Sequence, residues 1–212
     1  MNCRKLKGVR DGTVFHICNR GVLKKPMFFD EFDYGICEEI LSESLEKYRV
    51  PLHAYCLMPN HWHLLVEAPR GGILVQMLQR FSSVHAKTIR KRQENQGTGA
   101  VYQSRYRAHP VQKSEAFFRV KSYIENNPCK AGLCSKPEDW RWSTAYSEID
   151  RHILIATSPT PIPLNVLRPP LESWHSRIES ALFSQRPLGD VEWRNSFCEQ
   201  DGGTSVQARF AA

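Results

Sequence analysis

The chain lacks a run of about 18 consecutive apolar residues, the length that a membrane-spanning helix requires. Its basic start, MNCRKLKGVRDG, is not followed by an apolar segment of the kind found in signal peptides. Seven cysteines are scattered without a CxxC pair, which disfavours a disulfide framework and a structural zinc site. These absences favour a protein of the reducing cytoplasm that has no membrane partner.

What the sequence does have is length and positive charge, with 212 residues and a formal net charge of +7. The length is sufficient for one domain with a hydrophobic core and an extension. The charge favours a polyanionic partner, most often nucleic acid, although many basic proteins bind none. Proline-rich, weakly patterned sequence begins near residue 150. We therefore expect a domain over residues 1–149 and an irregular, partly helical extension over 150–212.

Hydrophobic periodicity predicts four strands and three helices in the order β-α-β-β-α-β-α. Asp30 and Ser114 are predicted helix N-caps, and Pro128 is expected to end the last helix near Asn127. Because the elements do not alternate as regular βαβ units, we expect an α+β domain with a mainly antiparallel sheet and helices packed on one face. The predicted strands are 12–20, 52–58, 61–67 and 101–111, and the predicted helices are 30–49, 71–93 and 114–127.

The segment HAYCLMPNHWHLLVEAP places two histidines directly after a predicted turn at Pro59-Asn60. Alternate side chains of a strand share a face, so His61 and His63 are expected to point one way and Trp62 the other, into a core. Two imidazoles at this spacing can bind one metal ion. The pattern alone is not specific, because surface or packed histidines produce it too.

A tyrosine on the last predicted helix offers the second half of a site. Tyr123 and Asn127 are four residues apart and therefore lie on the same helix face. A phenol, with a pKa of about 10, is a poor nucleophile at neutral pH unless a cation or base activates it. A divalent metal at the two histidines would supply that help and polarise a phosphate oxygen. The alternative is that Tyr123 is a half-buried aromatic residue packed on the sheet.

Taken together and in order, HAYCLMPNHWHLLVE, YIENNPCKAGL and PEDWRWSTAY resemble the single-tyrosine HUH transposases, in particular the REP-associated tyrosine transposases. The segments FHICNRGVLKKPMFFDEFDY and VYQSRYRAHPV resemble the same family, so the resemblance covers residues 13–147. It implies a ferredoxin-like sheet, Mg²⁺ or Mn²⁺ bound by His61, His63 and Asn127, and Tyr123 as the nucleophile. It also implies cleavage of single-stranded DNA next to a hairpin, which leaves a 5′-phosphotyrosine link and a free 3′-hydroxyl.

Basic side chains are the candidates for DNA contacts. Arg105 and Arg107 flank Tyr106, and in a strand both arginines would face one way to meet phosphates, while tyrosines can stack on unpaired bases. Arg20 resembles a family position near bound DNA. A further cluster ends the second predicted helix, where basic residues also complement the helix dipole or simply face water. This cluster consists of Lys87, Arg90, Lys91 and Arg92.

Two other functions remain open from the sequence. One is a protein that binds such hairpins without cutting them, and the other is an RNA-binding domain with exposed aromatic residues on its sheet. A two-histidine phosphodiesterase is disfavoured, because no His-x-Ser/Thr pair occurs. The remaining histidines, His16 and His109 among them, are predicted not to be ligands. Cys56 and Cys129 are predicted to be small core residues, and the resemblance together with the extension favours a monomer over a homodimer.

Overall fold

A computed structural model describes residues 6, 10–69, 72–92 and 99–146, together with residues 176, 178–180, 188–190, 192 and 194. The predicted boundary between residues 149 and 150 lies outside the described residues, as does most of the predicted extension. Within the described part of the chain, no helix is both long and apolar enough to cross a membrane.

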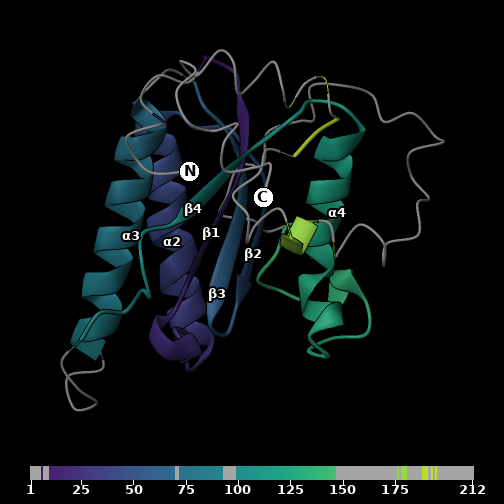
Figure 1. The fold of residues 1–212 in the computed structure, drawn as a ribbon. Coiled ribbons are helices and arrows are strands. Elements are labelled where there is room, and N and C mark those ends of the chain that lie inside the picture. The colour runs from purple at the N-terminus through teal and green to yellow at the C-terminus, as the bar shows by residue number, and fades with distance from the viewer. Residues whose placement is uncertain are drawn as a thin grey trace.

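A four-stranded antiparallel sheet in the order β2-β3-β1-β4 forms the middle layer of the protein (Figure 1). Its strands are β1 (Val14–Arg20), β2 (Leu52–Met58), β3 (His61–Glu67) and β4 (Arg107–Val111). The β2-β3 hairpin turns at Pro59-Asn60, as predicted. The βαββαβ order of the elements up to β4 is that of a ferredoxin-like fold, so the predicted α+β class is confirmed.

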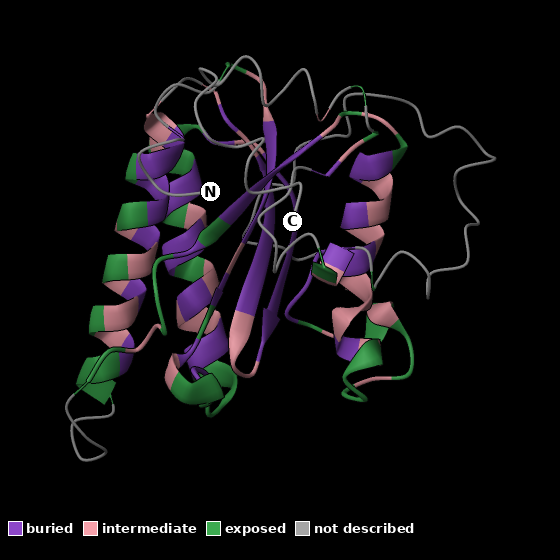
Figure 2. Ribbon diagram, in the orientation of Figure 1, coloured by how far each residue is buried: buried purple, intermediate pink, exposed green. Residues whose placement is uncertain are grey.

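Helices cover both faces of this sheet, which corrects the prediction that they pack on one face. α2 (Glu31–Tyr48) and α3 (Ile73–Arg92) pack together on one face, whereas α4 (Glu115–Lys130) packs on the other, mainly over β2 (Figure 1). The reason is that both sides of the strands carry buried apolar side chains, and all seven residues of β2 are buried (Figure 2). A sheet with two apolar faces needs a layer on each of them.

The sequence predicted how the helices begin. Asp30 caps α2, because its side chain accepts a hydrogen bond from the Asp33 amide at 2.9 Å. Ser114 caps α4, because its Oγ accepts a hydrogen bond from the Ala116 amide at 3.4 Å. Both caps satisfy backbone donors that the first turn leaves without helical partners. Two short 3-10 helices complete the elements, η1 (Val22–Lys24) and η2 (Pro137–Asp139).

α4 runs past Pro128 to Lys130, so the prediction that this proline ends the helix near Asn127 is wrong. A proline this late in a helix forfeits one backbone hydrogen bond without blocking the remaining turn. The chain leaves the helix at Gly132, whose φ of 71° is left-handed. The Leu133 amide there donates to the Pro128 carbonyl at 2.9 Å, which is the closure typical of a Schellman end.

Candidate active site

β3 presents its two site histidines to the face that α4 covers. His63 lies in the middle of the sheet, paired with Cys18 of β1 and Cys56 of β2, and its side chain is buried. Trp62 points the other way into the core under α3, where its indole N–H donates to the Tyr102 hydroxyl at 3.1 Å. The predicted alternation of side chains along this strand is therefore confirmed.

α4 brings Tyr123 directly against these histidines. The ring centroids of Tyr123 and His63 are 5.8 Å apart with the rings edge to face, and those of His63 and His61 are 5.0 Å apart. Asn127 lies one turn after Tyr123, and its side-chain amide donates to the Tyr123 carbonyl at 2.9 Å. The structure thus brings the histidine pair and the tyrosine into one cluster.

Burial makes the two histidines neutral bases in the metal-free protein. Together with a smaller effect of the nearby Arg20 charge, it lowers the pKa of His61 to about 4. Burial also holds the pKa of His63 well below its ordinary value, with smaller effects from His61, His16 and Arg20. Neutral imidazoles offer the lone pairs that a cation needs, so these residues can bind a metal ion at neutral pH without first losing a proton.

Each histidine has one ring nitrogen occupied and the other available. The Nδ1 of His61 lies 2.6 Å from the Asn60 Oδ1, an acceptor, so this nitrogen carries the proton. The Nδ1 of His63 lies 2.9 Å from the Nε2 of His16. The Nε2 of His63 is buried and has no hydrogen-bond partner among the described residues. A buried, unpartnered imidazole nitrogen beside a second neutral imidazole fits a divalent cation.

The donor set is that of an open site. Among the described residues, no group of three or more His, Cys, Asp or Glu side chains could hold a metal ion. The two histidines therefore need ligands of another kind, and Asn127, one turn after Tyr123 on α4, is the amide that the sequence predicts. Two imidazoles and an amide leave positions for water and phosphate oxygens, unlike the closed tetrahedron of structural zinc.

Tyr123 needs activation in this environment. Burial raises the pKa of its phenol above the ordinary value, while a hydrogen bond from the Asn127 side chain and the Arg20 charge act in the opposite direction. The phenol is therefore protonated at neutral pH in the metal-free protein. Positive charge at the histidines would stabilise the phenolate and so favour its attack on phosphorus.

His16 is a part of the cluster that sequence reasoning missed. It is fully buried in β1, opposite His109 of β4, and its ring lies 5.1 Å from that of His63 and 5.9 Å from that of Tyr123. His16 is 47 residues from His63 in the chain, and only the pairing of β1 with β3 brings the two together. Strand alternation gives the face on which His16 lies, but it does not give that pairing.

Two of the predicted DNA-contact residues lie at the site. Arg20 is exposed at the end of β1, opposite His61, and its charge influences both histidines and Tyr123. Arg107 is exposed at the start of β4, opposite Cys18, whose pKa its charge affects. Since Cys18 and Arg20 alternate along β1, both arginines lie on the face that carries the histidines.

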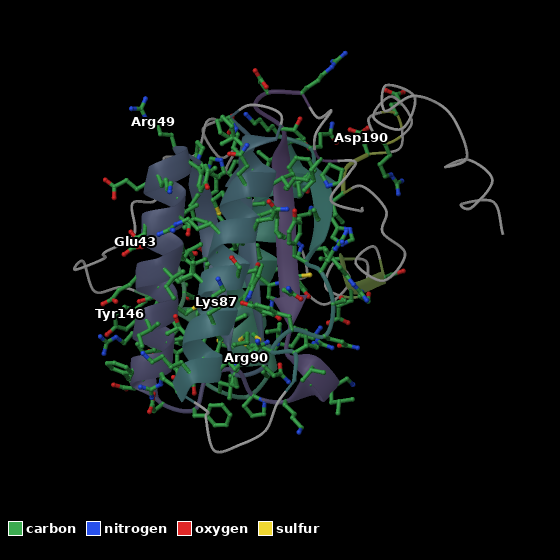
Figure 3. The ribbon with its side chains drawn as sticks, turned by 90° about the vertical axis from the view of Figure 1, so that its left-hand side faces the viewer. Glu43, Arg49, Lys87, Arg90, Tyr146 and Asp190 are labelled. Carbon is green, nitrogen blue, oxygen red and sulfur yellow. The ribbon has the colours of Figure 1, made fainter. Side chains whose placement is uncertain are left out.

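The other predicted DNA contacts lie elsewhere. Arg105 is exposed but precedes β4, so it does not alternate with Arg107 along a strand. Tyr106 is buried in the core under α2 and α3, which rules out the expected stacking on DNA bases by this residue. Lys87 and Arg90 are exposed on the outer side of α3, the layer across the sheet from α4 (Figure 3). The structure therefore does not bring them to Tyr123.

One basic side chain of the α3 cluster, Arg92, has a structural role. The Arg92 guanidinium lies 2.7 Å from the Asp33 carboxylate and 3.0 Å from the Asp30 carboxylate, both at the start of α2. It also lies over the Phe32 ring. Arg92 thus fastens the end of α3 to the start of α2.

Known proteins resemble this chain in sequence and in fold. The sequence profile of the family described as "Transposase IS200 like" matches residues 11–127, more than half of the chain. A Haemophilus influenzae protein named "Putative REP-associated tyrosine transposase" is 23% identical over 119 residues, which cover 52% of this chain and 68% of the relative. The solved structure of a REP-associated tyrosine transposase bound to a REP hairpin has the same fold, with a TM-score of 0.52 and 18% identity over 64% of this chain and 78% of that one.

The matched segment contains every element from β1 to the end of the site on α4. His61, His63 and Tyr123 all lie within it, and its last residue is Asn127. The chain therefore belongs to the IS200-like transposase family and is an enzyme of the DNA transposase class.

Proposed function

We propose that this protein cleaves and rejoins single-stranded DNA next to a hairpin, with Tyr123 as the nucleophile and Mg²⁺ or Mn²⁺ bound by His61, His63 and Asn127. The observation that carries the proposal is the 5.8 Å contact between the Tyr123 and His63 rings, in a site where the Nε2 of His63 has no hydrogen-bond partner among the described residues. The solved relative bound to a REP hairpin supports the choice of a hairpin partner.

The metal ion, when bound, would polarise a phosphate oxygen and stabilise the charge that develops in the transition state. This chain's residues would hold it through the Nε2 atoms of His61 and His63 and the side-chain oxygen of Asn127. Because the Asn127 nitrogen donates to the Tyr123 carbonyl, its oxygen is the atom left for a cation. Mg²⁺ and Mn²⁺ prefer sites that keep water and phosphate oxygens among the ligands.

Cleavage follows from the position of Tyr123. The phenol loses its proton to solvent, and its oxygen forms a bond to the phosphorus of the scissile phosphodiester. The bond from phosphorus to the 3′ oxygen breaks, and this oxygen takes a proton from solvent as the upstream strand leaves with a 3′-hydroxyl. The downstream strand stays on the enzyme as a 5′-phosphotyrosine. In the rejoining step a 3′-hydroxyl attacks this phosphotyrosine and releases Tyr123.

Arg20 and Arg107 are the side chains placed to hold the DNA backbone during these steps. Both are exposed, and both lie on the face of the sheet that carries His61 and His63. Guanidinium groups suit phosphate oxygens because they donate two hydrogen bonds in one plane. We propose that the DNA passes along the end of the sheet where β1 ends and β4 begins, and that a single subunit is sufficient for binding.

The sheet of this protein does not suit the RNA-binding alternative. Such modules stack bases on exposed aromatic side chains of the central strands. Here helices cover both faces, and Phe15, the aromatic residue of the central strand β1, is fully buried.

The test is transfer of a label to the protein. A single-stranded hairpin oligonucleotide taken from DNA beside the gene, labelled at its 3′ end, would be incubated with the protein and Mn²⁺ and run on a denaturing gel. We expect the label to migrate with the protein, and to be lost with a chelator and in Tyr123→Phe. Tyr48→Phe, on the far side of the molecule in α2, is the matched control and should retain the label. Hairpin binding without any adduct, with Mg²⁺ and Mn²⁺ and both flanks tried, would instead indicate a protein that binds but does not cut.

A further inference from the structure

His16 lies against two of the rings of the site, those of His63 and Tyr123. It is fully buried in the central strand β1, and its ring stacks on that of His63 at 26°. The same ring meets the Tyr123 ring in an edge-to-face contact at 5.9 Å. A buried imidazole costs free energy unless hydrogen bonds or other interactions compensate it. His16 therefore requires a reason to occupy a position where an aliphatic residue would pack.

The hydrogen bond between His16 and His63 supplies that reason. The Nε2 of His16 and the Nδ1 of His63 are 2.9 Å apart, so one nitrogen donates a proton and the other accepts it. This contact occupies the Nδ1 of His63 and leaves its Nε2 as the nitrogen that faces the site. If His63 donates, its Nε2 carries a lone pair, and if His16 donates, that same Nε2 carries a proton and is unable to bind a cation.

We propose that His16 is a positioning residue for the metal ligand His63, whose Nδ1–H it accepts so that the Nε2 lone pair of His63 is directed to the cation. The inference rests on the proposed metal site. A ligand histidine commonly donates its second ring nitrogen to a fixed acceptor, which sets both the tautomer and the angle of the ring. Here His16 takes the place that a carboxylate or a carbonyl has in other sites.

The other histidine of the pair has a parallel arrangement. The Nδ1 of His61 donates to the Asn60 side chain at 2.6 Å. The Asn60 nitrogen in turn donates to the Lys24 carbonyl at 3.1 Å, which fixes the amide orientation. In both histidines Nδ1 is thus hydrogen-bonded within the protein, and Nε2 is available to a cation. The shared pattern on two separate partners is what points to a role for His16 beyond packing.

His16 also connects the metal ligand to the nucleophile. Because its ring touches both His63 and Tyr123, it sets the spacing between the atoms that would bind the cation and the phenol that attacks. Loss of the His16 ring would allow the His63 and Tyr123 rings to move. Loss of the acceptor nitrogen alone would leave the tautomer of His63 unfixed. Two substitutions separate these effects.

The test compares His16→Phe, which keeps a ring and removes the acceptor, with His16→Gln, which restores an acceptor near the original Nε2 position. His85→Phe is the matched control, because His85 is also fully buried but lies on α3 across the sheet. The full chain would be titrated with Mn²⁺ alone, by calorimetry. We expect His16→Phe to bind Mn²⁺ about 10- to 100-fold more weakly than the wild type. His16→Gln should regain most of the affinity, and His85→Phe should match the wild type.

A second readout does not depend on the metal or on folding of the variants. Long-range ¹⁵N–¹H spectra of the metal-free wild type report which nitrogen of His63 carries the proton. We expect the proton on Nδ1, and a proton on Nε2 would overturn the inference. The inference about His16 would also be overturned if His16→Phe bound Mn²⁺ as tightly as His85→Phe. A wild type that binds no Mn²⁺ but has the His63 proton on Nδ1 would count against the proposed metal site and not against the hydrogen bond.

Discussion

The buried His85 predicts a specific loss of stability in acid. It lies on α3, away from the proposed metal ligands, and its Nδ1 is 2.7 Å from the Tyr102 hydroxyl. The indole N–H of Trp62 donates to that same hydroxyl, so the Tyr102 proton points to His85 and occupies its Nδ1 lone pair. Protonation of His85 in the folded protein must place a charge in the core, away from water. We therefore expect His85 to remain neutral in the folded protein.

The size of the effect follows from the pKa. Burial lowers the pKa of His85 from 6.5 to about 4 in the folded protein. Between these values the unfolded chain binds a proton that the folded protein does not, so stability falls as the pH falls from 6.5 to 4. At 1.36 kcal/mol per pKa unit, His85 costs about 3 kcal/mol of unfolding free energy by pH 4. Below that pH the folded protein also binds the proton, and the loss levels off.

Urea unfolding followed by circular dichroism, at several pH values from 4 to 7.5, measures this loss. Other groups also titrate in this range, so the informative quantity is the difference between the wild type and His85→Phe. We expect the wild type to lose about 3 kcal/mol more than the variant between pH 7.5 and pH 4. Parallel pH profiles for the two proteins would refute the assignment of His85 as a buried neutral base.

Two glycine substitutions test the packing argument, one in the loop after β1 and one in α2. A Cβ at Gly21 would lie 2.4 Å from the Lys25 carbonyl oxygen, so Gly21→Ala should lower the unfolding free energy by about 1–3 kcal/mol in urea. Gly35→Ala in α2, where a Cβ meets nothing within 4 Å, should instead raise it by about 0.5–1 kcal/mol, and equal effects would contradict the packing argument. Arg20→Gln should weaken hairpin binding and reduce the steepness of the plot of log K against log salt concentration by about one, whereas Lys47→Gln should change neither. Fluorescence anisotropy with labelled hairpin at several salt concentrations checks this, and an unchanged slope for Arg20→Gln would remove this residue from the DNA interface.

Local patterns predicted much of the fold and the faces of β3 and α4 on which the candidate site residues lie. Side chains alternate between the two faces of a strand, which correctly predicted that the histidines of β3 lie on the face opposite Trp62. Strand geometry fixes this alternation wherever the strand pairs. The four-residue spacing on α4 correctly placed Tyr123 and Asn127 on one helix face. These predictions depend only on neighbours within one element, which a sequence displays directly.

What the sequence did not predict depends on how elements pack. The contact of His16 with His63 requires the β1-β3 register, which no local pattern contains. The position of α4 across the sheet from α2 and α3 depends on both faces of the strands being apolar. Tyr106 was assigned to DNA because its neighbours are arginines, yet the bend before β4 turns it into the core. In each case the local sequence is compatible with two outcomes, and tertiary packing selects one of them.

The most direct test of the central claim is to locate the DNA on the protein. The covalent adduct would be digested with nuclease and trypsin and analysed by mass spectrometry. Cleavage after Lys121 and Lys130 yields the peptide SYIENNPCK, in which Tyr123 is the single tyrosine. We predict a nucleotide 5′-phosphate on Tyr123 of this peptide. A nucleotide on any other residue, or an unmodified SYIENNPCK from purified adduct, would contradict the role of Tyr123 as the nucleophile.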